Sequence, residues 1–273
     1  MSKKEIDFSK PKELCKYIIE NTPVGLLDSS LKSLKALLKE ETLKSPEVVN
    51  AIKRYREDHL MPISIKDVKQ KVIISSSNKD SDGFYYDQGQ KIRFKLNSKG
   101  EGEKVEKFES KDENRQKIED KLKEYINKYY NKNNTIYTVY YDSIVDKIHV
   151  LICGQIINEV NFWNGEWLSI WELDLSDKKL TGEIKINTIY YEDGNVQFNF
   201  KKEYDTKIEG KDIADELIKY IEVNENEIQS KLEKVNQNFS ETYIKPLRKR
   251  ISLIGDDMKW SLDQIQFSQH LNQ

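Results

Sequence analysis

Apolar residues in the first quarter of the chain recur with the spacing of amphipathic helices, and prolines divide this region into segments. Ser45-Pro46-Glu47 supplies an N-cap residue, a proline at the first helical position and an acid in the first turn. The pattern predicts three short helices that form a small antiparallel bundle. Their predicted apolar faces are Leu14, Tyr17 and Ile18 in the first, Leu27, Leu31, Leu34 and Leu38 in the second, and Val48, Val49, Ile52 and Tyr55 in the third.

From about residue 67 the apolar pattern changes to a period of two, which is typical of half-buried strands. Asn164-Gly165 and Asp193-Gly194 stand between such runs and favour type I′ hairpin turns, which place the glycine at positive φ. Residues 135–202 are therefore expected to form an antiparallel meander. The clearest alternating positions are Ile92, Phe94 and Leu96; Tyr137, Val139 and Tyr141; and Ile148, Val150 and Ile152.

Two helices are expected beside the sheet. One, at about residues 115–131, carries apolar residues at helical spacing, and the charged, glycine-bearing segment 98–117 before it is expected to be a surface loop. The other is a single long helix that lies as a lid across one face of the sheet. Its apolar stripe comprises Ile213, Leu217, Ile221, Ile228, Leu232, Val235 and Phe239.

The predicted fold class is thus α+β, in four parts. These are an N-terminal helical bundle (1–66), an antiparallel sheet region with one inserted helix (67–208), a long helix packed on the sheet (209–244) and a C-terminal tail (245–273). The tail holds a basic cluster, followed by a segment with apolar residues on two opposite sides. Because too little chain remains to bury both sides, this tail is expected to dock on another molecule.

Composition narrows the class of protein. The 273 residues carry a net charge of −2, so no global field attracts nucleic acid or an anionic membrane. With 37% hydrophobic residues the chain can build a core, and no apolar run approaches the ~20 residues that span a bilayer. The N-terminus lacks the apolar region of a secretory signal, and two cysteines make no disulfide framework. A soluble intracellular protein is expected.

Motifs for catalysis are missing from the sequence. It has no glycine-rich phosphate loop, no CxxC or HExxH metal pattern and no nucleophile elbow. Cys15 and Cys153 are interpreted as small buried hydrophobic residues. We therefore expect no enzyme activity, no catalytic residues, no cofactor and no metal.

The segment Asn161-Phe-Trp-Asn-Gly-Glu-Trp-Leu-Ser-Ile-Trp171 closely resembles a signature of the F-actin capping protein alpha subunit family. Tyr190-Tyr-Glu-Asp-Gly-Asn-Val-Gln197 resembles the second signature of that family. Weaker similarity extends over nearly the whole chain, including residues 51–65, 91–95 and 137–140.

This resemblance implies a fold close to the one predicted from the residues: an N-terminal helical bundle, a five-stranded antiparallel sheet, a long helix across it and a mobile C-terminal tail. It also implies a protein that pairs with a second subunit. In the family, alpha and beta subunits share one fold and their sheets join into one continuous sheet. The expected partner is a capping protein beta subunit, and a homodimer of this chain is the alternative. Trp163, Trp167 and Trp171 are assigned to the fold and the dimer.

The resemblance also implies the function: a cytoplasmic subunit of the cytoskeleton that caps the barbed end of the actin filament and blocks monomer addition and loss. Phosphoinositides and capping-protein regulators are further implied partners. Gly255-Asp256-Asp257 stands where the family has basic residues, and Arg250 compensates in part. The implied actin-binding residues are Lys245, Arg248, Lys249, Arg250, Met258, Trp260, Leu262, Ile265 and Phe267.

Two other functions are considered. One is a structural end-binding subunit of another actin-related assembly. The other is nucleic-acid binding through residues 53–56 and 248–250, which the near-neutral charge disfavours.

Overall fold

The computed structural model describes residues 10–239, except for 67, 69, 98–99, 109–111, 159, 193–194 and 211. Two compact units, 1–222 and 223–273, meet inside the C-terminal helix α6 (Ile213–Phe239). The first unit contains the helical region and the sheets, and the described part of the second is the rest of α6, residues 223–239.

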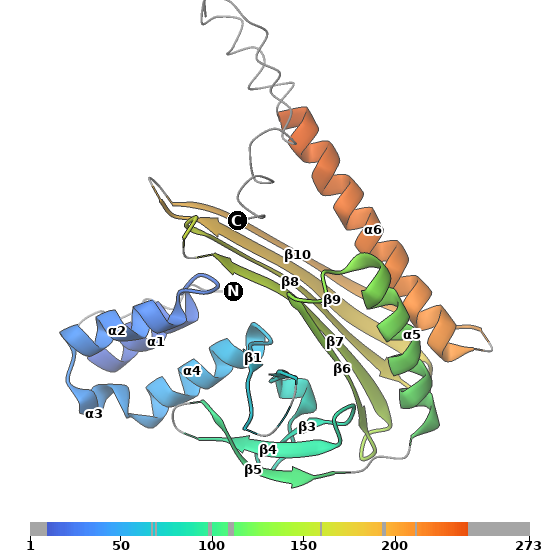
Figure 1. The fold of residues 1–273 in the computed structure, drawn as a ribbon, viewed down its shortest axis with the longest axis horizontal. Helices are drawn as coiled ribbons and strands as arrows, with labels where there is room; N and C mark the ends of the chain where they lie inside the picture. The colour runs from blue at the N-terminus through green and yellow to red at the C-terminus, as the bar shows by residue number, and fades with distance from the viewer. Residues whose placement is uncertain are drawn as a thin grey trace, which may run out of the picture. The chain divides into compact units, whose positions relative to one another are not determined.

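An N-terminal bundle packs around one apolar core, as predicted (Figure 1). Its helices are α1 (Pro11–Glu20), α2 (Leu27–Leu37), α3 (Glu40–Leu43) and α4 (Pro46–Asp58). The short α3 was missing from the prediction of three helices. In α1 the buried residues are Cys15 and Ile19, whereas Tyr17 of the predicted face is 40% exposed. The core comprises Cys15, Ile19, Leu27, Leu34, Val48, Ala51 and Tyr55.

Short strands and one 3₁₀ turn follow the bundle and build a second apolar core, which includes Val72, Tyr85 and Phe94. The strands are β1 (Pro62–Ile63), β2 (Val72–Ile73), β3 (Tyr85–Asp87), β4 (Ile92–Leu96) and β5 (Gly102–Lys107), and the turn is η1 (Ser76–Asn78). The expectation of a loop at 98–117 was wrong here, because β5 pairs with β4 and a helix begins at Glu113. The side chain of Arg93 in β4 binds Glu106 in β5, so a charged pair holds a strand whose side chains are mostly exposed.

The central sheet has five antiparallel strands, as predicted. They are β6 (Thr135–Asp142), β7 (Lys147–Asn158), β8 (Trp163–Asp174), β9 (Lys179–Tyr190) and β10 (Val196–Lys207). Their order in the sheet is β10-β9-β8-β7-β6, so each strand pairs only with its neighbours in the chain. This is the meander that the period-two pattern and the hairpin signals indicated.

The predicted turn at Asn164-Gly165 is wrong. Both residues lie within β8, and the hairpin closes earlier, because Asn158 pairs with Trp163 and Phe162 takes the positive φ of 55°. Gly165 is not at positive φ, so a β-branched residue at this position would not be forced into the left-handed backbone conformation. The pairing of Val196 with Tyr190 confirms a hairpin between β9 and β10, whose predicted turn residues 193–194 lie outside the described residues.

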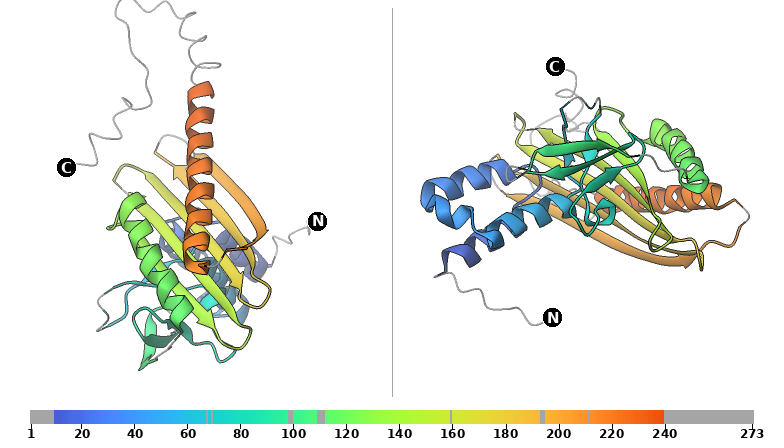
Figure 2. Two further views of the ribbon diagram at one scale, coloured as in Figure 1. Left: turned by 90° about the vertical axis from the view of Figure 1, so that its right-hand side faces the viewer. Right: turned by 90° about the horizontal axis from the view of Figure 1, so that it is seen from below.

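Helices and short strands cover opposite faces of the sheet. The helix α5 (Glu113–Tyr129) and the first turns of α6 lie side by side on one face (Figure 2), joined by a 2.8 Å ion pair between Lys121 and Asp215. On the other face, Leu60 and Ile73 pack against Leu168 of β8. Successive strand residues point to opposite faces, so β8 contributes Leu168 to the side of the short strands and Trp171 to the side of the helices.

Candidate functional site

The actin-binding residues expected from the sequence lie outside the described residues. They are Lys245, Arg248, Lys249, Arg250, Met258, Trp260, Leu262, Ile265 and Phe267. Their assignment remains a prediction.

Strand β10 forms one edge of the central sheet. It pairs with β9 over all of its length, from Val196 to Lys207, and no strand within the described ranges pairs with its outer side. An edge strand presents a row of N–H and C=O groups that can pair with another chain. The edge is 12 residues long, which makes it a template for joining two sheets.

The side chains of β10 differ between its two faces. Gln197, Asn199, Lys201, Glu203 and Asp205 point to one face, and the other carries apolar and aromatic residues. Val196 and Phe198 are 66% and 42% exposed. On the same face Tyr190 of β9 lies beside Val196 and is 38% exposed. These three residues, Tyr190, Val196 and Phe198, are called the edge patch below.

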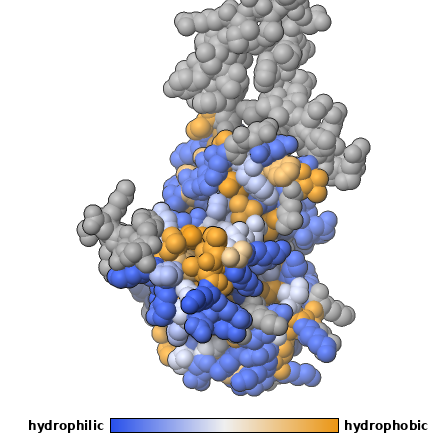
Figure 3. Space-filling model, turned by 90° about the vertical axis from the view of Figure 1, so that its left-hand side faces the viewer, coloured by the Kyte–Doolittle hydropathy of each residue, from blue (hydrophilic) through white to orange (hydrophobic). Residues whose placement is uncertain are grey.

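The sequence analysis did not identify the edge patch, although the alternation of Val196, Phe198 and Phe200 with polar residues was visible. Apolar side chains also gather among hydrophilic ones on the side of the molecule where the N-terminal helices lie (Figure 3). Leu37 of α2, one of the N-terminal helices, is 79% exposed.

The three tryptophans of the first signature share the face of β8 that α5 and α6 cover. Trp171 is fully buried, and its ring contacts Tyr204 of β10 and Tyr220 of α6, with ring centroids 5.1 and 5.8 Å away. Its indole Nε1–H donates to Ser169 Oγ over 2.7 Å. Trp163 and Trp167 are half-buried toward the other end of the strand. The burial of Trp171 confirms a role in the fold.

A buried polar junction connects the bundle to the central sheet. The Nδ1 atom of His59, at the end of α4, lies 2.6 Å from Oε1 of Glu166, whose side chain is wholly buried in β8. Asn187 of β9 donates to the same oxygen over 2.8 Å. Asn164, from the segment predicted as a turn, donates its Nδ2–H to the carbonyl of Val24 over 3.0 Å. The Asn and Glu of the first signature therefore position the N-terminal region.

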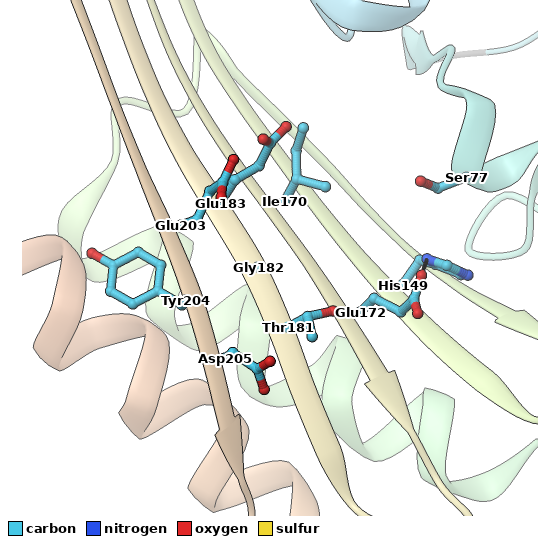
Figure 4. A pocket seen from close by; sticks show the side chains of 10 residues that line it. All are labelled: Ser77, His149, Ile170, Glu172, Thr181, Gly182, Glu183, Glu203, Tyr204 and Asp205. Carbon is cyan, nitrogen blue, oxygen red and sulfur yellow. Dashed lines mark ion pairs between the residues drawn. The ribbon is translucent and has the colours of Figure 1, made fainter. Parts of the chain in front are cut away.

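An open groove of about 490 Å³ lies over the polar face of β8, β9 and β10 (Figure 4). Ser77 of η1 and His149 of β7 stand at one side of it. The remaining lining residues are Ile170, Glu172, Thr181, Gly182, Glu183, Glu203, Tyr204 and Asp205.

The carboxylates of this groove are matched by lysines. Lys147 pairs with Glu172 over 2.5 Å, and Lys201 reaches both Glu183 and Glu203, over 3.0 and 2.7 Å. Lys185 also pairs with Glu183 over 2.5 Å, and Lys179 pairs with Asp205 over 3.1 Å. Because four lysines match the four carboxylates that line it, the groove presents an ion-pair ladder and not a concentrated negative charge.

His149 makes stability depend on pH. Burial lowers the pKa of this imidazole below its ordinary value of 6.5, even though the nearby Glu172 and Asp142 act in the opposite direction and Lys147 adds to the lowering. Between the two pKa values the unfolded chain binds a proton that the folded chain excludes. The contribution of His149 to the free energy of unfolding is therefore constant above pH 6.5 and is lost as the pH falls through the pKa of the folded protein. We expect His149→Gln to reduce the loss of unfolding free energy between pH 7 and about 5, measured by urea titration. Parallel pH profiles for the variant and the unchanged protein would contradict this assignment.

Cysteines and metal-ligating side chains do not gather into a cluster in the described residues. Cys15 and Cys153 are free and buried, as interpreted from the sequence, and burial raises the pKa of both thiols. No group of three or more metal-ligating side chains occurs among the residues that the structure describes. In the same residues, no helix has the length and apolar character needed to cross a membrane. Among the features described above, the edge of β10 and the edge patch are open to solvent, whereas the polar junction is an internal contact of the fold.

Comparison with known proteins matches this chain to one family. The family model described as F-actin capping protein alpha subunit matches residues 15–269. The F-actin-capping protein subunit alpha of Gibberella zeae is 28% identical over 257 residues, which cover 91% of this chain and 92% of that protein. The protein of the same name from Neurospora crassa is 29% identical over 256 residues, with the same coverage of 91% and 92%.

A solved structure agrees with the fold. The homodimeric actin capping protein alpha subunit from Plasmodium berghei matches with a TM-score of 0.71 at 24% sequence identity. The match covers 92% of this chain and all of that chain.

Proposed function

The chain belongs to the F-actin capping protein alpha subunit family, and from this premise we propose that it caps the barbed end of the actin filament as one subunit of a dimer. It acts in the actin cytoskeleton by binding and not by catalysis. Capping blocks both the addition and the loss of actin monomers at that end.

One observation carries the proposal: the family model matches residues 15–269, which include the bundle, the sheet, α6 and most of the tail. Relatives named as capping protein subunits are aligned over 91% of the chain. The family-model match includes residues 245–269, the part of the tail in which we place the actin-binding residues.

Elongation of actin from preformed filament seeds tests the function. With monomer at a concentration that supports growth only from barbed ends, we expect nanomolar to micromolar protein to stop elongation. Seeds already blocked at their barbed ends, growing from pointed ends at higher monomer concentration, are the control and should elongate normally. Unchanged barbed-end growth would refute the proposal, and inhibition of both ends would indicate binding of monomers.

We propose the outer edge of β10 as the site where the second subunit joins. Three features support this: the edge has no partner strand in the described residues, the edge patch beside it is exposed, and a relative of the same fold is a homodimer. The second subunit is either a beta subunit or a second copy of this chain.

Light scattering on the pure chain tests the dimer. We expect particles heavier than the 32.2 kDa of one chain at micromolar concentration, because a single subunit leaves the edge and its patch uncovered. A mass of two chains identifies a homodimer, and larger self-association indicates that a beta subunit is needed. A well-folded monomer would refute the homodimer and the expectation that one subunit alone is not stable.

Phe198→Lys is expected to weaken dimerisation roughly tenfold or more, because it places a charge in the edge patch. Val105→Lys is a matched control, since both residues are 42% exposed and both lie on edge strands, β10 and β5. The measurement is the dimer dissociation constant from sedimentation velocity. Equal constants for the two variants would show that dimerisation does not use this patch.

A further inference from the structure

Two lysines and one carboxylate meet on a buried tyrosine between α4 and β3. The ring of Tyr85, which is completely buried, has Lys53 Nζ 5.8 Å and Lys79 Nζ 5.7 Å from its centroid. Glu57, one turn after Lys53 in α4, accepts a 2.5 Å hydrogen bond from the Tyr85 hydroxyl. Lys79 donates to the same Glu57 oxygen over 3.0 Å.

This cluster has one more positive charge than negative. The Oε1 atom of Glu57 is shared between Tyr85 and Lys79, and only 9% of the Glu57 side chain is exposed. Within the described part of the chain, Lys53 forms no ion pair with a carboxylate and interacts instead with the ammonium group of Lys79. Lys53 is thus a half-buried amine beside a like charge.

Burial lowers the pKa of Lys53 most, direct contact with the Lys79 side chain and then the charge of Lys79 lower it further, and the charge of Glu57 opposes the shift. Lysines with carboxylate partners behave in the opposite way. The hydrogen bond to Glu40 raises the pKa of Lys44, and that to Asp215 raises the pKa of Lys121. A larger fraction of Lys53 is therefore a neutral, nucleophilic amine near pH 7.5.

We propose that Lys53 is a site of acylation by thioesters. The lone pair of its neutral Nζ attacks the thioester carbonyl carbon, a C–N bond forms, and the C–S bond breaks. The thiolate leaves with the electron pair of that bond, and the surplus proton on nitrogen passes to the thiolate or to water. The products are an amide at Lys53 and a free thiol.

Acylation changes the charge of the cluster. An amide carries no charge, so Lys79 and Glu57 remain as a balanced pair on the Tyr85 ring. The repulsion between the two ammonium groups is then relieved. We expect the acylated protein to have a higher melting temperature than the unmodified one.

The test uses the acetyl thioester of N-acetylcysteamine on the intact chain at pH 7.5, with the acetylation rate of each lysine determined by mass spectrometry. We expect Lys53 to react roughly threefold or more faster than Lys44 and Lys121, with the difference shrinking as the pH rises toward 10. A rate for Lys53 at or below those of the two reference lysines would overturn the proposal.

Three variants test whether the charge of Lys79 makes Lys53 reactive. Lys79→Met lets Glu57 pair with Lys53 and should slow acetylation of Lys53 several-fold at pH 7.5, whereas Lys79→Arg keeps the neighbouring charge and should keep the rate. Lys12→Met removes a lysine elsewhere and should change nothing. If Lys79→Met leaves the rate of Lys53 unchanged, or if Lys79→Arg slows it equally, the like charge does not activate Lys53.

Discussion

Reversing Lys245, Arg248 and Lys249 to glutamate should slow association with actin barbed ends by roughly tenfold or more. These residues and Arg250 place four positive charges within six positions of the sequence. Such a cluster accelerates encounter with an acidic surface, and salt screens it over a Debye length of about 8 Å at physiological ionic strength. Gly255-Asp256-Asp257 adds no positive charge, so the cluster carries most of this effect.

Single-filament microscopy measures the association rate directly, and calorimetry of the same variant should show a nearly unchanged melting temperature. A matched truncation that removes residues 256–273 keeps the basic cluster and deletes Met258, Trp260, Leu262, Ile265 and Phe267. We propose that these residues become buried on docking, and we therefore expect the truncation mainly to raise the dissociation rate. Capping at the normal rate by the charge-reversed protein would show that the cluster is only a solvated segment.

Trp171→Ala should lower the free energy of unfolding by about 3–5 kcal/mol, the usual cost of removing a large buried aromatic side chain. Trp171 is completely buried, and its ring fills the space between β8, Tyr204 of β10 and Tyr220 of α6. Its loss also leaves the Ser169 hydroxyl without the indole donor. Urea unfolding followed by circular dichroism measures the effect, and a loss below about 1 kcal/mol would show that the site refills without penalty.

Adding a side chain at a glycine beside Trp171 tests the same packing by crowding the indole ring. A Cβ atom on Gly182 of β9 would lie 2.2 Å from Cε3 of Trp171, so Gly182→Ala should cost about 1–3 kcal/mol through displacement of the ring. Gly165→Ala, on the neighbouring strand and the same face, is the control, because its Cβ would lie 3.3 Å from the nearest atom, Cγ2 of Thr188. Similar losses for both variants would mean that any side chain on this face is destabilising.

The order of most helices and strands could be predicted from the sequence, because apolar residues recur every three or four positions in the helices and every second position in the strands. Leucines three and four residues apart predicted α2, and alternating Ile148, Val150 and Ile152 predicted β7, with both sets buried or half-buried as expected. By contrast, β5 carries exposed charged residues and a single valine, so no apolar alternation marked it as a strand. Its pairing depends on β4, a contact that no local pattern contains.

The error at Asn164-Gly165 has a tertiary cause. Asn-Gly is a strong local turn signal, but the Asn164 amide is buried, where it binds the carbonyl of Val24 and accepts from the backbone N–H of Asn158. These contacts, 140 and six residues away in the chain, outweigh the turn preference. Residues that join separate parts of a fold are therefore the ones that local rules misread.

For the candidate site, the resemblance carried by Trp163, Trp167 and Trp171 gave the family, which physical pattern alone did not. The sequence shows that Val196 and Phe198 share one face of a strand, because they alternate with Gln197 and Asn199. It does not show that this strand lies at the edge of the sheet, and the edge position is what leaves these residues exposed.

The strand order also has a consequence for synthesis of the protein. Because each strand pairs with its predecessor, β6 to β9 can form hairpins in turn as they emerge, with short loops to close. The strand β10 is added last, when β6 to β9 are already paired with one another and β9 offers its outer edge. The edge that we propose for dimerisation thus becomes available late, and the nascent chain presents it for the shortest time to unrelated strands that could pair with it.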